Sequence, residues 1–146
     1  MIADSRTSVA FTGHRTYRGA AADALRRTVG ELYARGFRNF LSGMAVGFDL
    51  AAAEAVLELR ERAPGVRLVA AVPFRGQEMR FSPADRERFR RVLAEADSVE
   101  VLAPAYHRGC YAVCNDFLVY NARVLVAWYD GSPGGTRYTV RRALGR

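Results

Sequence analysis

Residues 39–62 read NFLSGMAVGFDLAAAEAVLELRER. A short β-rich run over 39–41 is followed by the glycine-containing segment 42–49 and then by an alanine- and leucine-rich helical pattern over 50–62. A buried strand that leads through glycines into an apolar helix is the repeating unit of a parallel α/β sheet. The segment therefore predicts one strand-turn-helix unit of such a sheet.

The same alternation continues on both sides of this unit. Further strands are expected over 8–11, 67–72, 99–102 and 124–129, and further helices over 20–35, from Ser82 onward, over 111–120 and over 137–144. Ser82 and Pro83 begin their helix with a capping hydroxyl and a proline in the first turn. The pattern predicts a single α/β domain over residues 1–146, with a doubly wound parallel sheet of about five strands and helices on both faces.

Composition indicates an ordinary globular chain. Its 146 residues are 50% hydrophobic and 25% charged, which is enough apolar material for one packed core. No apolar run approaches the roughly 20 residues that span a bilayer. The N-terminus shows no secretory signal, and two cysteines are too few for a disulfide framework. We expect a cytoplasmic protein with no membrane partner.

The net charge of +7 comes from 22 basic and 15 acidic residues, and every basic residue is arginine. A nucleic-acid partner is one interpretation of the surplus, and a solvated basic face is the simpler one. The absence of lysine has a firmer consequence. A Walker-type ATPase needs a lysine in its phosphate loop, so that class is excluded.

Glycines and polar side chains follow the expected strands. Parallel topology brings the loops after all strands to one edge of the sheet, where doubly wound folds bind ligands. Glycines there let backbone N–H groups approach a phosphate, and each following helix N-terminus adds a favourable dipole. We therefore expect a phosphate-bearing ligand at this edge. The candidate ligand-binding residues are Thr12, Gly13, His14, Arg15, Ser42, Gly43, Met44, Gly47, Asp49, Pro73, Phe74, Gln77, Asn115, Gly134, Gly135 and Thr136.

Several of these residues have a functional and a structural interpretation. Arg15 suits a bidentate phosphate contact. Asp49 suits a ribose hydroxyl, or is a helix-start acid that stays ionised beside the dipole. Single glycines such as Gly13 are also common turn residues. Trp128 and Tyr129 either stack on a base or pack in the core.

No catalytic or metal-binding set stands out. His107, Cys110 and Cys114 match no standard zinc spacing, so we interpret the cysteines as core residues and expect no metal and no cofactor. His14 has no acid partner nearby in sequence. Glu54 and Glu58 form an ordinary solvated helix stripe, although Glu54 and Asp49 are the candidate acids if any catalysis exists.

Four motifs, in chain order, resemble the YpsA-like branch of the SLOG superfamily. They are Thr12-Gly13-His14-Arg15, residues 42–49, Pro73-Phe74 with Gln77, and Gly134-Gly135-Thr136. The likeness covers nearly the whole chain. It implies a Rossmann-like fold that binds a nucleotide or nucleotide-derived ligand, in a sensing or regulatory role. Superfamily relatives include the "lonely guy" phosphoribohydrolases and the DNA-processing protein that loads single strands.

The chain departs from that branch in two places. Cys114 stands before Asn115, where the branch carries an arginine, which weakens a phosphate contact there. Branch members also continue into another strand where this chain ends at Arg146, so the resemblance leaves the completeness of the C-terminus open.

Three functions follow from these observations. The first is a non-catalytic sensor of a nucleotide-like ligand, such as ADP-ribose or a nucleoside phosphate. The second is a phosphoribohydrolase-like N-glycosidase, disfavoured because Arg137 and its neighbours offer no glutamate after Gly134-Gly135-Thr136. The third is a single-stranded nucleic-acid binding module, weakened by the lack of an interleaved aromatic and basic run. A homo-oligomer is left open.

Overall fold

The computed structural model describes residues 4–145. Within them, five strands form one parallel sheet in the order β4-β3-β2-β1-β5. The strands are β1 (Ser8–Gly13), β2 (Asn39–Ser42), β3 (Arg67–Val72), β4 (Ser98–Val101) and β5 (Val124–Trp128). The main helices are α1 (Ala22–Ala34), α2 (Phe48–Arg60), α3 (Pro83–Glu95), α4 (Cys110–Tyr120) and α5 (Gly135–Leu144). Short 3₁₀ helices η1 (Ser5–Thr7) and η2 (Gln77–Arg80) complete the chain, and the predicted Rossmann-like α/β fold is confirmed.

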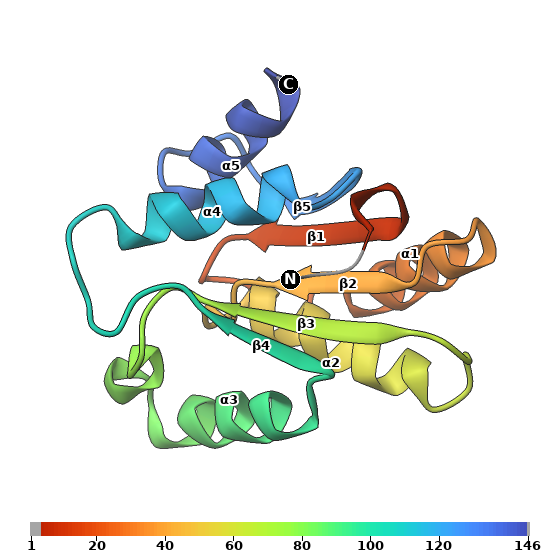
Figure 1. The fold of residues 1–146 in the computed structure, drawn as a ribbon, viewed down its shortest axis with the longest axis horizontal. Helices are drawn as coiled ribbons and strands as arrows, with labels where there is room; N and C mark the ends of the chain where they lie inside the picture. The colour runs from red at the N-terminus through yellow and green to blue at the C-terminus, as the bar shows by residue number, and fades with distance from the viewer. Residues whose placement is uncertain (1–3, 146) are drawn as a thin grey trace.

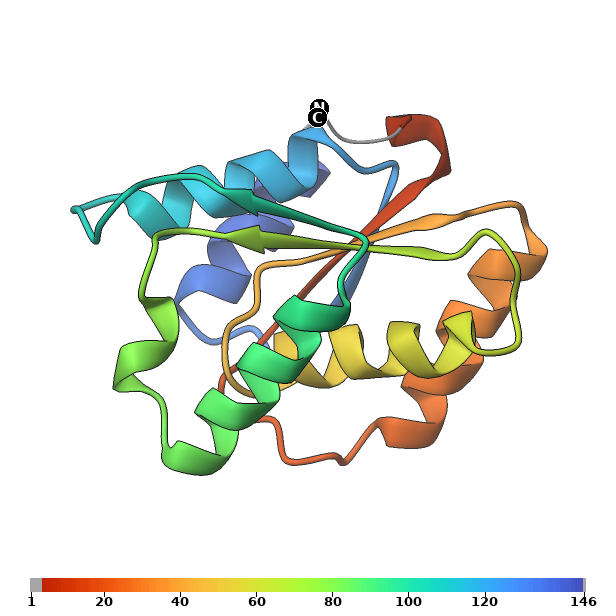
Figure 2. The same cartoon turned by 60° about the horizontal axis from the view of Figure 1, so that its bottom comes forward.

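Helices cover both faces of the sheet (Figures 1 and 2). Alternate strand residues point to opposite faces, so Phe11 and Phe40 pack with α1, α2 and α3 in the larger core cluster. On the other face, Leu41 packs with Cys114 and Leu118 of α4. Helix α5 lies against α4, β1 and β5. Burial on both faces explains the nearly continuous apolar composition of the inner strands.

The strand order reverses beside β1. From β1 the chain adds β2, β3 and β4 in one direction, and α4 then crosses back to place β5 on the other side of β1. In doubly wound sheets a crevice opens at such a reversal, outside the carboxyl ends of the strands. The fold therefore positions the loops after β1, β2, β3 and β5 around one crevice.

Local signals explain the element ends. Ser82 caps α3 as predicted, because its Oγ accepts the backbone N–H of Asp85 at 3.2 Å. Two helices begin two residues earlier than expected: α2 at Phe48 and α5 at Gly135. In both cases the glycine turn leads directly into the helix. Each helix N-terminus therefore lies closer to the sheet edge than the apolar pattern indicates.

Candidate ligand site

A cavity of about 370 Å³ lies at the carboxyl edge of the sheet. This volume falls in the range of small-molecule sites. Loops after four strands and the first two turns of α4 contribute to its wall. The lining residues are Thr12, Gly13, His14, Arg15, Gly43, Ala45, Asp49, Pro73, Gln77, Tyr111, Cys114, Asn115, Gly134, Gly135 and Thr136.

Most of the candidate ligand-binding residues from the sequence are brought together in this wall, and four are not. Ser42, Met44 and Phe74 are buried behind the wall, and Gly47 lies in the turn outside it. These four residues do not line the cavity, although each lies in or directly beside a loop that contributes to its wall.

The turn after β2 is held by Ser42 and by two residues with positive φ. Ser42 Oγ donates to the carbonyl of Asp49 at 2.9 Å and accepts the N–H of Met44 at 3.2 Å. Met44 is fully buried with φ of 65°, a conformation that is uncommon for a residue with a side chain. Gly47 has φ of 83° and packs against the Arg15 backbone. The turn is thus fixed by tertiary contacts before any ligand binds.

Asp49 presents a buried carboxylate to the cavity wall. The backbone N–H of Ala45 donates to this carboxylate, and Oδ1 has no hydrogen-bond partner within residues 4–145. Burial raises the pKa of Asp49 from 3.8 to about 7, against the lowering effects of the Ala45 N–H and the Arg15 charge. A pKa near this value leaves Asp49 partly protonated at neutral pH, rather than fully ionised as its place at a helix start led us to expect.

Gln77 is the second buried acceptor on this wall. Its side chain is held by Nε2, which donates to the carbonyl of Gly43 at 3.2 Å. Gln77 is only 4% exposed, and its Oε1 finds no partner in the part of the chain that the structure describes. Uncompensated buried acceptors are rare in folded proteins and concentrate where ligands or waters bind.

The N-terminus of α5 forms the opposite side of the cavity. Gly134 has φ of 139° and precedes Gly135 and the buried Thr136. A Cβ on Gly135 would lie 3.6 Å from Nδ2 of Asn115, so this turn and the start of α4 face each other. Asn115 therefore reaches the cavity. Its neighbour Asp116 accepts from Tyr138 Oη at 2.9 Å and from Arg142 Nε at 3.0 Å instead.

His14 has an acid partner that the sequence did not reveal. Its Nε2 lies 2.9 Å from Oδ1 of Asp130 and 3.2 Å from the backbone N of the same residue. The ring donates to the carboxylate when Nε2 is protonated and accepts the N–H when it is not. Trp128 packs edge-on against Tyr17, with ring centroids 4.9 Å apart, so its interpretation as a core residue holds.

Arg15 and Tyr111 form the rim of the cavity. The guanidinium carbon of Arg15 lies 5.2 Å from the centroid of the Tyr111 ring. Tyr111, Ala45 and Cys114 also line the cavity, although they are not among the residues expected from the sequence. The place of Tyr111 in the chain could have identified it. Gly109, with φ of 88°, precedes α4 at the carboxyl edge of the sheet, so the first turn of that helix faces the crevice.

A family model described as the YspA SLOG family (YpsA) matches residues 10–145. The chain belongs to this family. Curated relatives of the SLOG-family chain include a UPF0398 protein from Shouchella clausii, 38% identical over 62% of the chain and 50% of the relative. Another, from Halalkalibacterium halodurans, is 29% identical over 84% of the chain and 67% of the relative. The matched region thus spans between half and two thirds of these proteins.

Two solved structures share the fold of the SLOG-family chain. DNA processing protein A from Streptococcus pneumoniae superposes with a TM-score of 0.68 at 18% identity, covering 96% of this chain and 47% of that one. The protein of the same name from Helicobacter pylori gives 0.67 at 18% identity, covering 95% and 61%. That structure is described as showing a single-stranded DNA binding mode of the H. pylori protein.

The remaining candidates in the SLOG-family chain lie outside the cavity or have structural partners. Glu54 pairs with Arg88, whose Nη2 lies 2.6 Å from Oε1, so Glu54 is tied to α3 and does not reach the site. Burial raises the pKa of Cys114 to about 12, with the Asp49 charge adding to the effect, and its Sγ donates to the carbonyl of Ala71. Within residues 4–145 no group of three metal-ligating side chains occurs.

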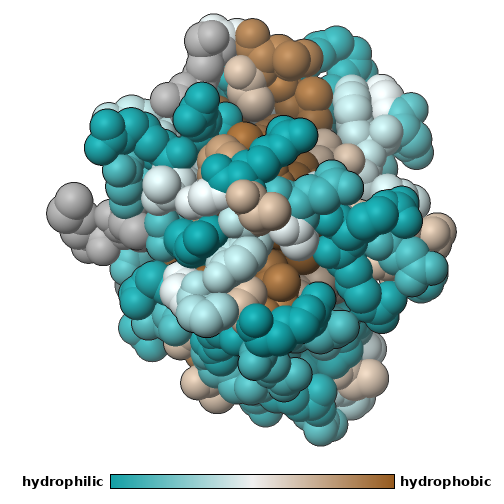
Figure 3. All heavy atoms as spheres, turned by 90° about the vertical axis from the view of Figure 1, so that its right-hand side faces the viewer, coloured by the Kyte–Doolittle hydropathy of each residue, from teal (hydrophilic) through white to brown (hydrophobic). Residues whose placement is uncertain are grey.

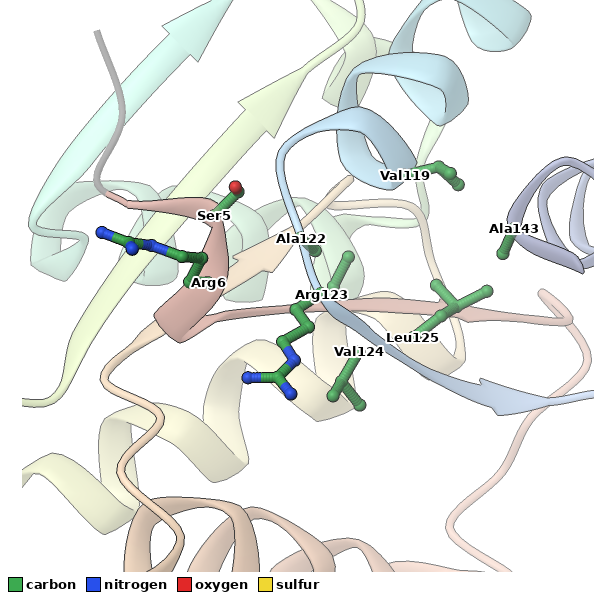
Figure 4. Close-up of a pocket in the computed structure, with 9 residues that line it drawn as sticks. Ser5, Arg6, Val119, Ala122, Arg123, Val124, Leu125 and Ala143 are labelled. Carbon is green, nitrogen blue, oxygen red and sulfur yellow. The ribbon is translucent and has the colours of Figure 1, made fainter. Parts of the chain in front are cut away.

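A second cavity, of about 310 Å³, lies beside β5 rather than at the carboxyl edge (Figure 4). It is lined by Ser5, Arg6, Ala10, Val119, Ala122, Arg123, Val124, Leu125 and Ala143. Figure 3 views the end from which β1 and β2 start, and shows hydrophobic surface gathered at the top, where α5 and β5 lie. This cavity is mainly apolar and has no glycine turn in its lining, so it lacks the features of a phosphate site.

None of the helices described within residues 4–145 has both the length and the apolar character that crossing a bilayer requires.

Proposed function

We propose that this protein binds a nucleotide or a nucleotide-derived ligand, such as a nucleoside phosphate or ADP-ribose, at the carboxyl edge of its sheet. One observation carries the proposal. Helices α2, α4 and α5 all begin after a glycine at this edge, and none has a side-chain cap. At α2 and α4 the first helical N–H already donates to a backbone carbonyl, of His14 and His107 respectively. The start of α5 lines the cavity without a side-chain cap, so its N–H groups and its dipole favour an anion there. By contrast, α3 starts away from the cavity and is capped by Ser82.

Hydrogen-bond acceptors and the anion-binding glycine turn lie on different sides of the cavity. The loop after β1 separates the acceptors Asp49 and Gln77, which follow β2 and β3, from the glycine turn at α5, which follows β5. In our proposal the phosphate binds at the α5 turn with Arg15, away from the acidic side chain. The sugar hydroxyls then lie toward Asp49 and Gln77, and the ligand is held for sensing or regulation.

Ligand binding is expected to raise the melting temperature, because a ligand that binds only the folded state stabilises it by mass action. AMP and ADP-ribose at millimolar concentration should each give a shift in a thermal-unfolding assay. Arg15→Ala and Gly135→Asp should abolish the shift, the first by removing a phosphate contact and the second by adding a negative charge at the α5 turn.

Both variants are expected to fold. Arg15 is exposed, and Gly135 has room for a side chain and ordinary backbone angles. Arg62→Ala, at an exposed site beyond α2, is the matched control and should keep the wild-type shift. A broad nucleotide panel that leaves the wild-type melting temperature unchanged would show that the proposal is wrong.

Turnover of the ligand is not expected, so the proposal is a binding protein and not a phosphoribohydrolase. Cleavage of an N-glycosidic bond needs a positioned acid or base. Arg137 follows the α5 turn and stays protonated, and Glu54 is paired with Arg88 outside the cavity. Purified protein incubated with nucleoside monophosphates should release no free base. Release that scales with protein concentration and is lost in Asp49→Asn would contradict this.

Single-stranded nucleic acid is the second candidate ligand. The described binding mode of H. pylori DNA processing protein A brings this class into consideration. The observation that favours it here is an exposed tyrosine, Tyr106, which lies against Phe74 next to the cavity rim. Any such binding should weaken steeply with salt, since arginine–phosphate contacts release counterions. Fluorescence anisotropy of a labelled strand between about 50 and 200 mM salt measures this slope, and a salt-independent affinity would argue against phosphate contacts.

A further inference from the structure

Three aromatic side chains from separate segments meet beside the cavity. Phe74 follows β3, Tyr106 lies in the loop between β4 and α4, and Tyr111 is in the first turn of α4. Phe74 contacts both tyrosines edge-on, with ring centroids 5.5 Å from Tyr106 and 5.8 Å from Tyr111. The two tyrosine rings are 6.4 Å apart. We call Phe74, Tyr106 and Tyr111, with Arg15 and Arg80, the tyrosine surface.

Each tyrosine of this surface has an arginine over one face of its ring. Arg15 lies 5.2 Å from the centroid of Tyr111, and Arg80 of η2 lies 5.8 Å from that of Tyr106. The rings nevertheless stay accessible: Tyr106 is 55% exposed and Tyr111 is 38% exposed, whereas Phe74 beneath them is buried. Figure 1 shows the loop between β4 and α4 projecting beyond the carboxyl ends of the strands, on the side where η2 lies. The expectation from the sequence that aromatic and basic residues are not interleaved is therefore wrong in three dimensions.

The tyrosine surface continues out of the cavity. Tyr111 and Arg15 line the cavity, whereas Tyr106 and Arg80 do not. A mononucleotide that fills the cavity has one base, which leaves Tyr106 without a partner. A ligand that uses both tyrosines must extend past the rim and carry more than one base.

The charge around the surface suits a polyanion. Arg75, Arg80 and Arg108 are exposed in the segments that carry it. Segment 102–111 has no acidic residue, and segment 73–81 has only Glu78. Glu78 is paired with Arg90 at 3.8 Å. Positive charge without a competing carboxylate attracts a phosphate backbone.

We propose that the tyrosine surface binds a short single strand of nucleic acid, with one nucleotide in the cavity and its neighbours stacked on Tyr111 and Tyr106. This inference rests on the proposed function, because the first nucleotide uses the same cavity. Every base has a π-face, so stacking on aromatic rings tolerates sequence, and arginine planes add to it. Phe74 keeps the two rings in place, and Arg80 contacts the phosphates of the nucleotides that lie outside the cavity.

The test compares ligands of increasing length. Binding of AMP, a dinucleotide, a trinucleotide and a trinucleotide with abasic second and third positions is measured by calorimetry on the full chain. We expect the trinucleotide to bind at least about tenfold more tightly than AMP, since one stacked base has roughly that effect. The abasic trinucleotide should lose this gain. Oligo-uridine and oligo-thymidine versions distinguish RNA from DNA as the strand.

The variants separate the tyrosine surface from the cavity. Tyr106→Ala should remove the gain with length and leave AMP affinity unchanged, while Tyr106→Trp should restore it. Tyr120→Ala, an exposed tyrosine at the far end of α4, is the matched control and should behave as wild type. Equal affinity of AMP and trinucleotide, or a Tyr106→Ala effect of the same size on both, overturns the inference and leaves the proposed function intact. No binding of any member overturns both.

Discussion

Replacing Asp49 with asparagine is expected to stabilise the protein at neutral pH and to remove most of the pH dependence of its unfolding between about pH 4 and 7. Burial raises the pKa of this carboxyl from 3.8 to about 7. The folded state therefore binds more protons than the unfolded state in this window. The free energy of unfolding falls as pH rises through it, and it becomes level above the folded-state pKa.

The expected size follows from the shift. At about 1.36 kcal/mol for each pKa unit, burial of the ionised carboxylate costs up to about 4 kcal/mol above pH 7. Asparagine has the same shape and carries no charge, and its Oδ1 can accept the Ala45 N–H that the carboxylate accepts in the native chain. Asp49→Asn should thus be more stable than wild type at pH 8 and close to it at pH 4.

Urea unfolding of both proteins between pH 4 and 8 measures the effect. Asp23→Asn is the matched control, because this side chain is 91% exposed and its replacement should change little. The same Asp49→Asn protein should give a smaller thermal response to AMP, since the amide offers the ribose hydroxyls one acceptor oxygen where the carboxylate offers two. A stability profile parallel to that of wild type would show that Asp49 is ionised at no cost in the folded protein.

Replacing Gly47 with alanine is expected to destabilise the fold by about 2–5 kcal/mol, through two effects. The residue has φ of 83°, which costs a residue with a Cβ roughly 1–2 kcal/mol. The new Cβ would also lie 2.6 Å from the Arg15 carbonyl oxygen and 2.8 Å from Arg15 Cα. Backbone atoms cannot rotate away, so the turns after β1 and β2 must separate, at a cost of about 1–3 kcal/mol.

Alanine substitutions at two other glycines separate the cost of the positive φ from the cost of the contact with Arg15. Gly19 has φ of 93° and open space at its Cβ position, so Gly19→Ala should cost only the conformational part, about 1–2 kcal/mol. Gly30 lies inside α1 with nothing within 4 Å, so Gly30→Ala should stabilise the protein by up to about 1 kcal/mol. Chemical unfolding of the three variants measures the series. Equal losses for Gly47→Ala and Gly19→Ala would show that the contact with Arg15 yields easily.

The architecture of this protein is determined by signals that lie close together in the chain. Apolar runs of strand length alternate with helical patterns, and glycines mark the turn after β2 and the start of α5. Strict alternation forces parallel strands, and parallel strands bring their carboxyl ends to one edge whatever their order. For this reason the approximate position of the site, and most of the residues around it, follow from residue order alone.

The chemistry of that edge depends on contacts between residues far apart in sequence. Asp49 looks like an ionised helix-start acid until the β1 loop, Gln77 and α4 enclose it, because desolvation is produced by the whole surrounding wall. His14 pairs with Asp130, which lies more than a hundred residues further along the chain. Phe74 follows β3, whereas Tyr106 and Tyr111 lie between β4 and the first turn of α4, and the sheet edge brings these two parts of the chain together. Local sequence specifies secondary structure and topology, whereas pKa values, ion pairs and a shared aromatic surface depend on through-space distances of a few ångströms, which only the packed chain sets.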